Sequence, residues 1–117
     1  MQREIDLLDS GVKEAKLAGR LDLKGAEEIS DQFTFQLASS KAPVLVNMAG
    51  VEFLASIGIR TLLSTARSLE RRGGKLVLLQ PTEFVKDVLT TAGVDQLLDI
   101  YDDRQAALDA LQAAVVD

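Results

Sequence analysis

The chain has 117 residues, 47% of them hydrophobic, with no Cys or His and a formal net charge of −5 at pH 7. This composition predicts one folded domain over residues 1–117 and disfavours nucleic acid and anionic membranes as partners. Without His or Cys the chain cannot form a Ser-His-Asp triad, a Cys nucleophile or the usual zinc site, so we expect no enzyme activity, metal or cofactor. No signal peptide or membrane span is recognisable, which predicts a cytoplasmic protein.

The N-terminal part of the sequence predicts a hairpin followed by a helix. Residues 3–8 and 12–21 alternate apolar and polar side chains as strands do, and the turn residues 9–11 favour antiparallel pairing. Residues 24–39 carry an apolar stripe at helical spacing, formed by Ala26, Ile29, Phe33 and Leu37. Asp22 stands where a helix cap is expected, and a contact to a partner is its alternative role.

The middle of the chain predicts a strand, a short loop and a helix. Val44-Leu45-Val46 is a continuous apolar run, typical of a strand covered on both faces. The loop is expected over 48–55 and the helix over 56–72, with the Gly73-Gly74 pair ending the helix. The inward stripe of this helix is Ile59, Leu62, Leu63, Ala66 and Leu69.

The C-terminal part predicts a strand over 75–79, a helix over 81–93, a short edge strand over 97–101 and a last helix through Val115. Asp102 and Gln105 resemble a capping box for that last helix. The expected inward residues are Val85, Val88, Leu89 and Ala92 in the first helix and Ala107, Leu108, Leu111 and Val115 in the second. Strands that alternate with helices imply parallel crossovers, so the fold class is α/β, a mixed sheet flanked by helices.

Ser56 stands at the junction between the loop and the middle helix. A helix start presents unpaired backbone N–H groups and the positive end of the helix dipole. A hydroxyl there can cap the helix, and a phosphate added to it would be well accommodated. Gly58, two residues later, is the mark of close packing.

The helix after Ser56 has a polar side made of Arg60, Ser64, Arg67 and Arg71, spaced three or four residues apart. This side is either a solvated face or a docking surface, and arginine is the cation favoured at interfaces. Met48, Phe53 and Leu54 in the expected loop could add apolar contacts to it, although burial is the commoner place for a Phe.

Several segments carry a family resemblance when taken together in order. They are Leu17-Ala-Gly-Arg-Leu-Asp22, Leu45-Val-Asn47 followed by Val51-Glu-Phe-Leu-Ala-Ser-Ile-Gly58, Gly74-Lys-Leu-Val-Leu-Leu79, and Val85 to Gly93. On these segments nearly the whole chain resembles the STAS domain, the module of bacterial anti-sigma factor antagonists. The resemblance implies a STAS-like mixed sheet flanked by helices.

The resemblance also implies partner switching. In the family, the unmodified domain binds an anti-sigma factor, usually a histidine-kinase-like ATPase that acts as a serine kinase. Phosphorylation of the motif serine dissociates the complex, and a metal-dependent serine phosphatase reverses the mark. The matching serine is Ser56, and the implied partner-binding residues are Asp22, Phe53, Leu54, Ala55, Ser56, Ile57, Gly58, Arg60, Ser64 and Arg67.

Two positions depart from the family pattern. Ala55 stands where the family has an acid, and Ile57 where it has Ser or Thr. The missing acid could weaken kinase recognition, or it could make a phosphate easier to accept. Both departures favour the alternative of a non-switched interaction or scaffold domain, in a stress-signalling complex or as partner in a transport complex. An enzyme or small-molecule carrier is the weakest interpretation.

Overall fold

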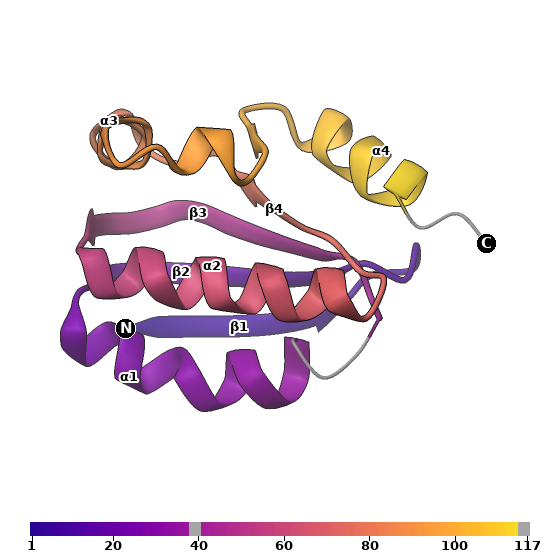
Figure 1. The fold of residues 1–117 in the computed structure, drawn as a ribbon, viewed down its shortest axis with the longest axis horizontal. Helices are drawn as coiled ribbons and strands as arrows, with labels where there is room; N and C mark the ends of the chain where they lie inside the picture. The colour runs from indigo at the N-terminus through magenta and orange to yellow at the C-terminus, as the bar shows by residue number, and fades with distance from the viewer. Residues whose placement is uncertain (38–40, 115–117) are drawn as a thin grey trace.

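The computed structural model describes residues 1–37 and 41–114, which form five strands in the sheet order β1-β2-β3-β4-β5 and the helices packed on them (Figure 1). The strands are β1 (Gln2–Leu7), β2 (Lys13–Leu21), β3 (Val44–Leu54), β4 (Leu76–Leu79) and β5 (Ile100–Tyr101). The helices are α1 (Leu23–Gln32), α2 (Ser56–Arg71), α3 (Glu83–Thr91) and α4 (Arg104–Ala114), with a π-helical turn η1 (Phe33–Leu37) and a 3₁₀ turn η2 (Val94–Gln96).

The sheet is mixed, as the sequence predicts. β1 and β2 form an antiparallel hairpin, closed by a turn in which Gly11 adopts a φ of 89°. The pairs β2–β3, β3–β4 and β4–β5 are parallel, with α1, α2 and α3 in the crossovers. The carboxyl ends of β2 and β3 therefore meet at one end of the sheet, which is where α1 and α2 begin.

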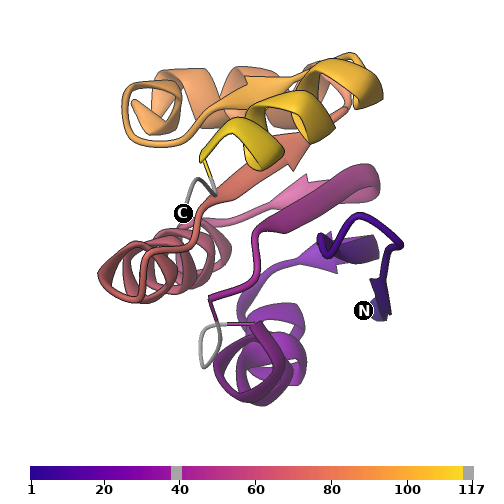
Figure 2. The same cartoon turned by 90° about the vertical axis from the view of Figure 1, so that its right-hand side faces the viewer.

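Helices lie on both faces of the sheet (Figure 2), and an apolar core lies under each face. On one face α1, α2 and α3 bury their stripes, with Ile29, Leu62 and Leu89 fully inaccessible. On the other face α4 places Ala107 and Leu111 against the sheet. β3 contributes to both cores, since Val46 points to the first and Leu45 to the second, which confirms the expectation of a central strand covered on both sides.

β3 is longer than the sequence predicts, because the expected loop over 48–55 continues as strand to Leu54. The strand pairing is irregular where Gly50 lies opposite Ala18. A Cβ at Gly50 would stand 2.9 Å from the Cβ of Ala18, so only glycine allows the strands to approach this closely. Gly50, which falls within the expected loop, is therefore a place of close strand packing.

The other differences from the sequence expectations concern helix ends and edges. The expected helix over 24–39 is α-helical only to Gln32 and continues as the π turn η1, and the edge strand shrinks to Ile100–Tyr101. Ala92 follows α3 and is exposed rather than inward-facing. Position 39, the expected end of the first helix, and Val115 lie outside the described residues.

The start of α4 is capped by Asp103 and not by the expected pair of Asp102 and Gln105. The Asp103 carboxylate accepts a hydrogen bond from the backbone N–H of Ala106 at 3.2 Å. Asp102 pairs instead with the Lys86 ammonium at 2.9 Å, and Gln105 donates to Asp109 at 2.9 Å. The helix begins one residue later than the capping box requires, so Asp102 is left outside it.

Candidate functional site

Ser56 is the first residue of α2 and follows directly on the end of β3. The capping position belongs to Ala55, whose methyl group cannot accept a hydrogen bond from the helix. The possibility that the Ser56 hydroxyl caps this helix is therefore wrong. Ser56 is exposed, and within the part of the chain that the structure describes its hydroxyl forms no hydrogen bond. The hydroxyl is therefore accessible to a modifying enzyme.

The start of α2 is held against the end of β2 by contacts to Leu21. The Ala55 N–H donates to the Leu21 carbonyl at 3.0 Å. Gly58 is buried, and a Cβ there would lie 2.6 Å from the Leu21 Cγ and 2.8 Å from its carbonyl oxygen. Close packing is thus the structural role of Gly58, as the sequence suggests, and the contact fixes the position of Ser56.

We expect Gly58→Ala to destabilise the fold. Overpacking costs about 1–3 kcal/mol, whereas the better helix propensity of Ala returns about 1 kcal/mol, which leaves a net loss of up to about 2 kcal/mol. The free energy of unfolding in urea measures this loss, with Ser64→Ala on the exposed side of α2 as the matched control. Equal unfolding free energies of wild type and Gly58→Ala would contradict this prediction, because they would show that Leu21 can move away from the added methyl group without loss of stability.

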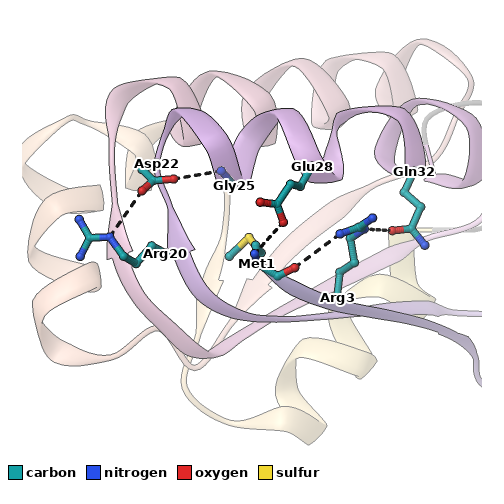
Figure 3. A network of polar contacts seen from close by, with 7 residues as sticks. All are labelled: Met1, Arg3, Arg20, Asp22, Gly25, Glu28 and Gln32. Atoms are coloured by element: carbon teal, nitrogen blue, oxygen red, sulfur yellow. Dashed lines mark hydrogen bonds and ion pairs between the residues drawn. The ribbon is translucent and has the colours of Figure 1, made fainter.

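Asp22, at the end of β2, caps α1 as the sequence predicts (Figure 3). Its carboxylate accepts a hydrogen bond from the Gly25 N–H at 3.0 Å, which holds the pKa of Asp22 below its usual value. The Arg20 guanidinium lies 3.5 Å from the other carboxylate oxygen and 4.2 Å from the centroid of the Phe53 ring. Phe53 is thus half-buried beneath a cation, at the same sheet end as Ser56.

The outer side of α2 carries Arg60, Ser64, Arg67 and Arg71, and all four are exposed. Along residues 1–37 and 41–114 none of these arginines is engaged in an ion pair. Ile57, in the first turn, is partly buried. The structure therefore leaves a run of unpaired cations along α2, although the chain as a whole is acidic.

The apolar extension expected from residues 48–55 differs from the prediction. Met48 is completely buried in the core, so it cannot belong to a surface. Leu54 is 4% exposed and lies at the bottom of a groove. The difference arises because β3 continues to Leu54, so that Met48, Val51 and Leu54 all join the first core.

The groove has a volume of about 630 Å³ and runs between the start of α2 and α3. These two segments lie at the same end of the sheet in Figure 1. Leu54, Ala55, Ser56 and Ile59 form its first wall, and Phe84, Asp87, Val88, Thr91 and Ala92 form the second. The sequence gives no indication of the second wall, apart from Phe84 falling outside the inward stripe of its helix.

Over the described ranges no group of three or more Asp or Glu side chains is placed to hold a metal ion. No described helix is both long enough and apolar enough to cross a membrane.

Comparisons with known proteins place these features in one family. A family model described as STAS domain matches residues 9–107. BtrV of Bordetella bronchiseptica, which is named a candidate anti-sigma factor antagonist, is 25% identical over 115 residues, 98% of each chain. The anti-sigma F factor antagonist of Lysinibacillus sphaericus is 22% identical over 117 residues, again 98% of each chain.

The fold is also that of a solved antagonist. Bacillus SpoIIAA in its unphosphorylated form superposes with a TM-score of 0.79 at 20% identity, covering 99% of this chain and 100% of SpoIIAA. The phosphorylated form of SpoIIAA gives a TM-score of 0.69 at 21% identity, covering 93% and 98% of the two chains.

Proposed function

Because the chain belongs to the STAS domain family, we propose that it is an anti-sigma factor antagonist whose binding to a kinase-type anti-sigma factor is controlled by phosphorylation of Ser56. The observation that carries the proposal is the position of Ser56 at the first turn of α2, where it is exposed and its hydroxyl has no hydrogen bond to any described residue. The proposal makes the chain a binding protein and a kinase substrate. A metal-dependent serine phosphatase would restore the unmodified state.

The backbone at the start of α2 could stabilise a phosphate on Ser56. In the described structure the N–H groups of Ser56 and Ile57 find no acceptor, as is usual in a first turn. Free N–H groups and the helix dipole both favour negative charge at this end of α2. The folded state should therefore tolerate the modification, and its cost should fall on the complex with the partner.

The test is phosphorylation by purified kinase-like anti-sigma factors from the source organism, one at a time, with ATP. Mass spectrometry should find one added phosphate, on Ser56, and none on Ser56→Ala. Ser30→Ala, which removes an exposed hydroxyl of α1 outside the proposed surface, should be modified like wild type. A phosphate on Ser64, or none with any of these kinases, would contradict the proposed site.

We propose that the partner-facing surface is the Ser56 end of the domain, from Asp22 and Phe53 through the first turn of α2 to Arg60, Ser64 and Arg67. Arg60 and Arg67 are exposed and form no ion pair with any described residue, so acidic groups of the partner could bind them without breaking an existing ion pair. Within this surface, Arg20 contacts both Asp22 and Phe53 and so holds them side by side.

Reversing two charges together, Arg60→Glu with Arg67→Glu, is expected to weaken binding of the anti-sigma factor about tenfold. Stability should change by no more than about 0.5 kcal/mol, because both side chains are exposed. Titration calorimetry measures the affinity, and the charge-matched control is Arg72→Glu with Lys41→Glu, two exposed positions away from the Ser56 end. Unchanged affinity of the double variant removes this side of α2 from the interface.

A second candidate is a non-switched interaction domain, a scaffold or the partner of a transport complex. Ala55 and Ile57 favour it, because they replace the acid and the hydroxyl expected beside the motif serine. This candidate predicts stable binding to a partner and no phosphate on Ser56, so the kinase experiment separates the two.

A further inference from the structure

We propose that the groove between α2 and α3 binds an apolar side chain of the anti-sigma factor, with a basic group of the same segment beside Asp87, and that a phosphate on Ser56 closes the groove. This inference rests on the proposed function, because it names the chemistry of the partner at the Ser56 surface. It adds α3 to the interface, which the sequence motifs do not indicate.

The size and apolar lining of the groove suit a large side chain. Its volume of about 630 Å³ falls within the range of about 300–1,000 Å³ that is typical of binding pockets. Leu54 and Ile59 line one wall, and Phe84 and Val88 the other. Phe84 is 57% exposed, so apolar surface remains in water until something covers it.

Asp87, the one charged residue in the groove, is the reason to expect a basic group in the partner segment. Asp87 is the only ionisable side chain among the lining residues, and no described residue pairs with it. The neighbouring cation, Lys86, is already engaged by Asp102 at 2.9 Å. A basic side chain of the partner would therefore find an unpaired carboxylate at the edge of an apolar surface.

Ser56 connects the groove to the switch. Ser56 and Ala55 both line the wall that faces α3, so a partner that covers Ser56 also covers the groove. A phosphate on Ser56 would add about −1.5 to −2 charges to the same lining that holds Asp87. An apolar side chain cannot enter beside a hydrated dianion without stripping its water, so phosphate and apolar side chain exclude each other.

The experiment measures affinity for the anti-sigma factor that phosphorylates Ser56. Phe84→Ala and Asp87→Lys should each weaken binding by at least about tenfold, as loss of a central contact does. The matched control is Phe35→Ala, which removes an equally large ring that is 72% exposed on η1, outside the groove. It should bind within about twofold of wild type, and all three variants should melt like wild type.

A double-variant cycle tests the connection to Ser56. If phosphate and apolar side chain exclude each other, the loss caused by Ser56→Asp with Phe84→Ala should be clearly smaller than the product of the two single losses. Fully multiplicative losses would overturn the link between groove and switch.

Other outcomes separate this inference from the proposed function. If the anti-sigma factor binds wild type tightly and both groove variants equally well, the groove is wrong and the proposed function stands. If no anti-sigma factor binds, both the proposed function and the groove inference are wrong. If sedimentation shows that Phe84→Ala converts a dimer of this chain into a monomer, the groove is filled by a second copy and the inference is overturned.

Discussion

Phosphorylation of Ser56 is expected to weaken the complex with the anti-sigma factor about a hundredfold. A bulky dianion of about −1.5 to −2 charges must lose water against a surface that fits a small hydroxyl. A penalty of about 3 kcal/mol on binding corresponds to that factor. The first turn of α2 should accommodate the phosphate in the folded chain, so the penalty is expected on binding and not on folding.

The measurement is the dissociation constant before and after phosphorylation, by titration calorimetry with a non-hydrolysable ATP analogue. Ser56→Asp should lose part of the affinity, and Ser56→Ala should bind permanently. The melting temperature of the phosphorylated protein should be no lower than that of the unmodified protein, which shows that the loss belongs to the interface. Equal affinity of the two forms, with Ser56→Asp binding like wild type, favours the scaffold function.

Removing the Arg104 guanidinium is expected to cost about 3 kcal/mol of folding free energy, the lower end of what breaking a buried ion pair costs. Glu14, whose side chain is 1% exposed, accepts two hydrogen bonds from Arg104, at 2.8 and 2.5 Å, and a third from Asn47 at 3.1 Å. Arg104→Ala leaves that carboxylate in place with only Asn47. The lower end applies because the Arg104 side chain is 44% exposed, so water can fill the space that it leaves beside Glu14.

Urea unfolding of Arg104→Ala measures this loss, and Lys86→Ala is its control. Lys86 forms an equally direct ion pair with Asp102 at 2.9 Å, but both side chains are exposed, and such a pair contributes at most about 1 kcal/mol. Equal losses in the two variants would contradict a special role for burial of Glu14.

The effect of Arg104 should depend on pH in a defined direction. The hydrogen bond from Arg104 lowers the pKa of Glu14 in the folded state below the ordinary value of 4.5. The stabilisation is therefore fully present above pH 4.5 and is lost as the pH falls through the lower folded-state pKa. The stability difference between wild type and Arg104→Ala should shrink in acid, whereas a difference that stays constant to low pH would exclude this ion pair as its cause.

The sequence by itself determined the features whose cause is local. Alternation and a glycine turn set the β1–β2 hairpin, and the apolar run Val44–Val46 set the central strand. Helical spacing and the Gly73-Gly74 pair placed α2 from Ser56 to within one residue of its end. Asp22 capped α1 as expected, since a cap depends on only the next three residues.

Only the tertiary structure decided what depends on segments far apart in the chain. Glu14 and Arg104 are 90 positions apart, and no local pattern pairs them. The length of β3 depends on the neighbouring Ala18, which makes Gly50 a point of close packing. The groove exists because the crossover after β4 places α3 across from the start of α2, so that Phe84 and Asp87 line the same groove as Ser56. Local patterns fix which side chains a segment turns inward or outward, but the chain's path through the sheet determines which outward side chains meet.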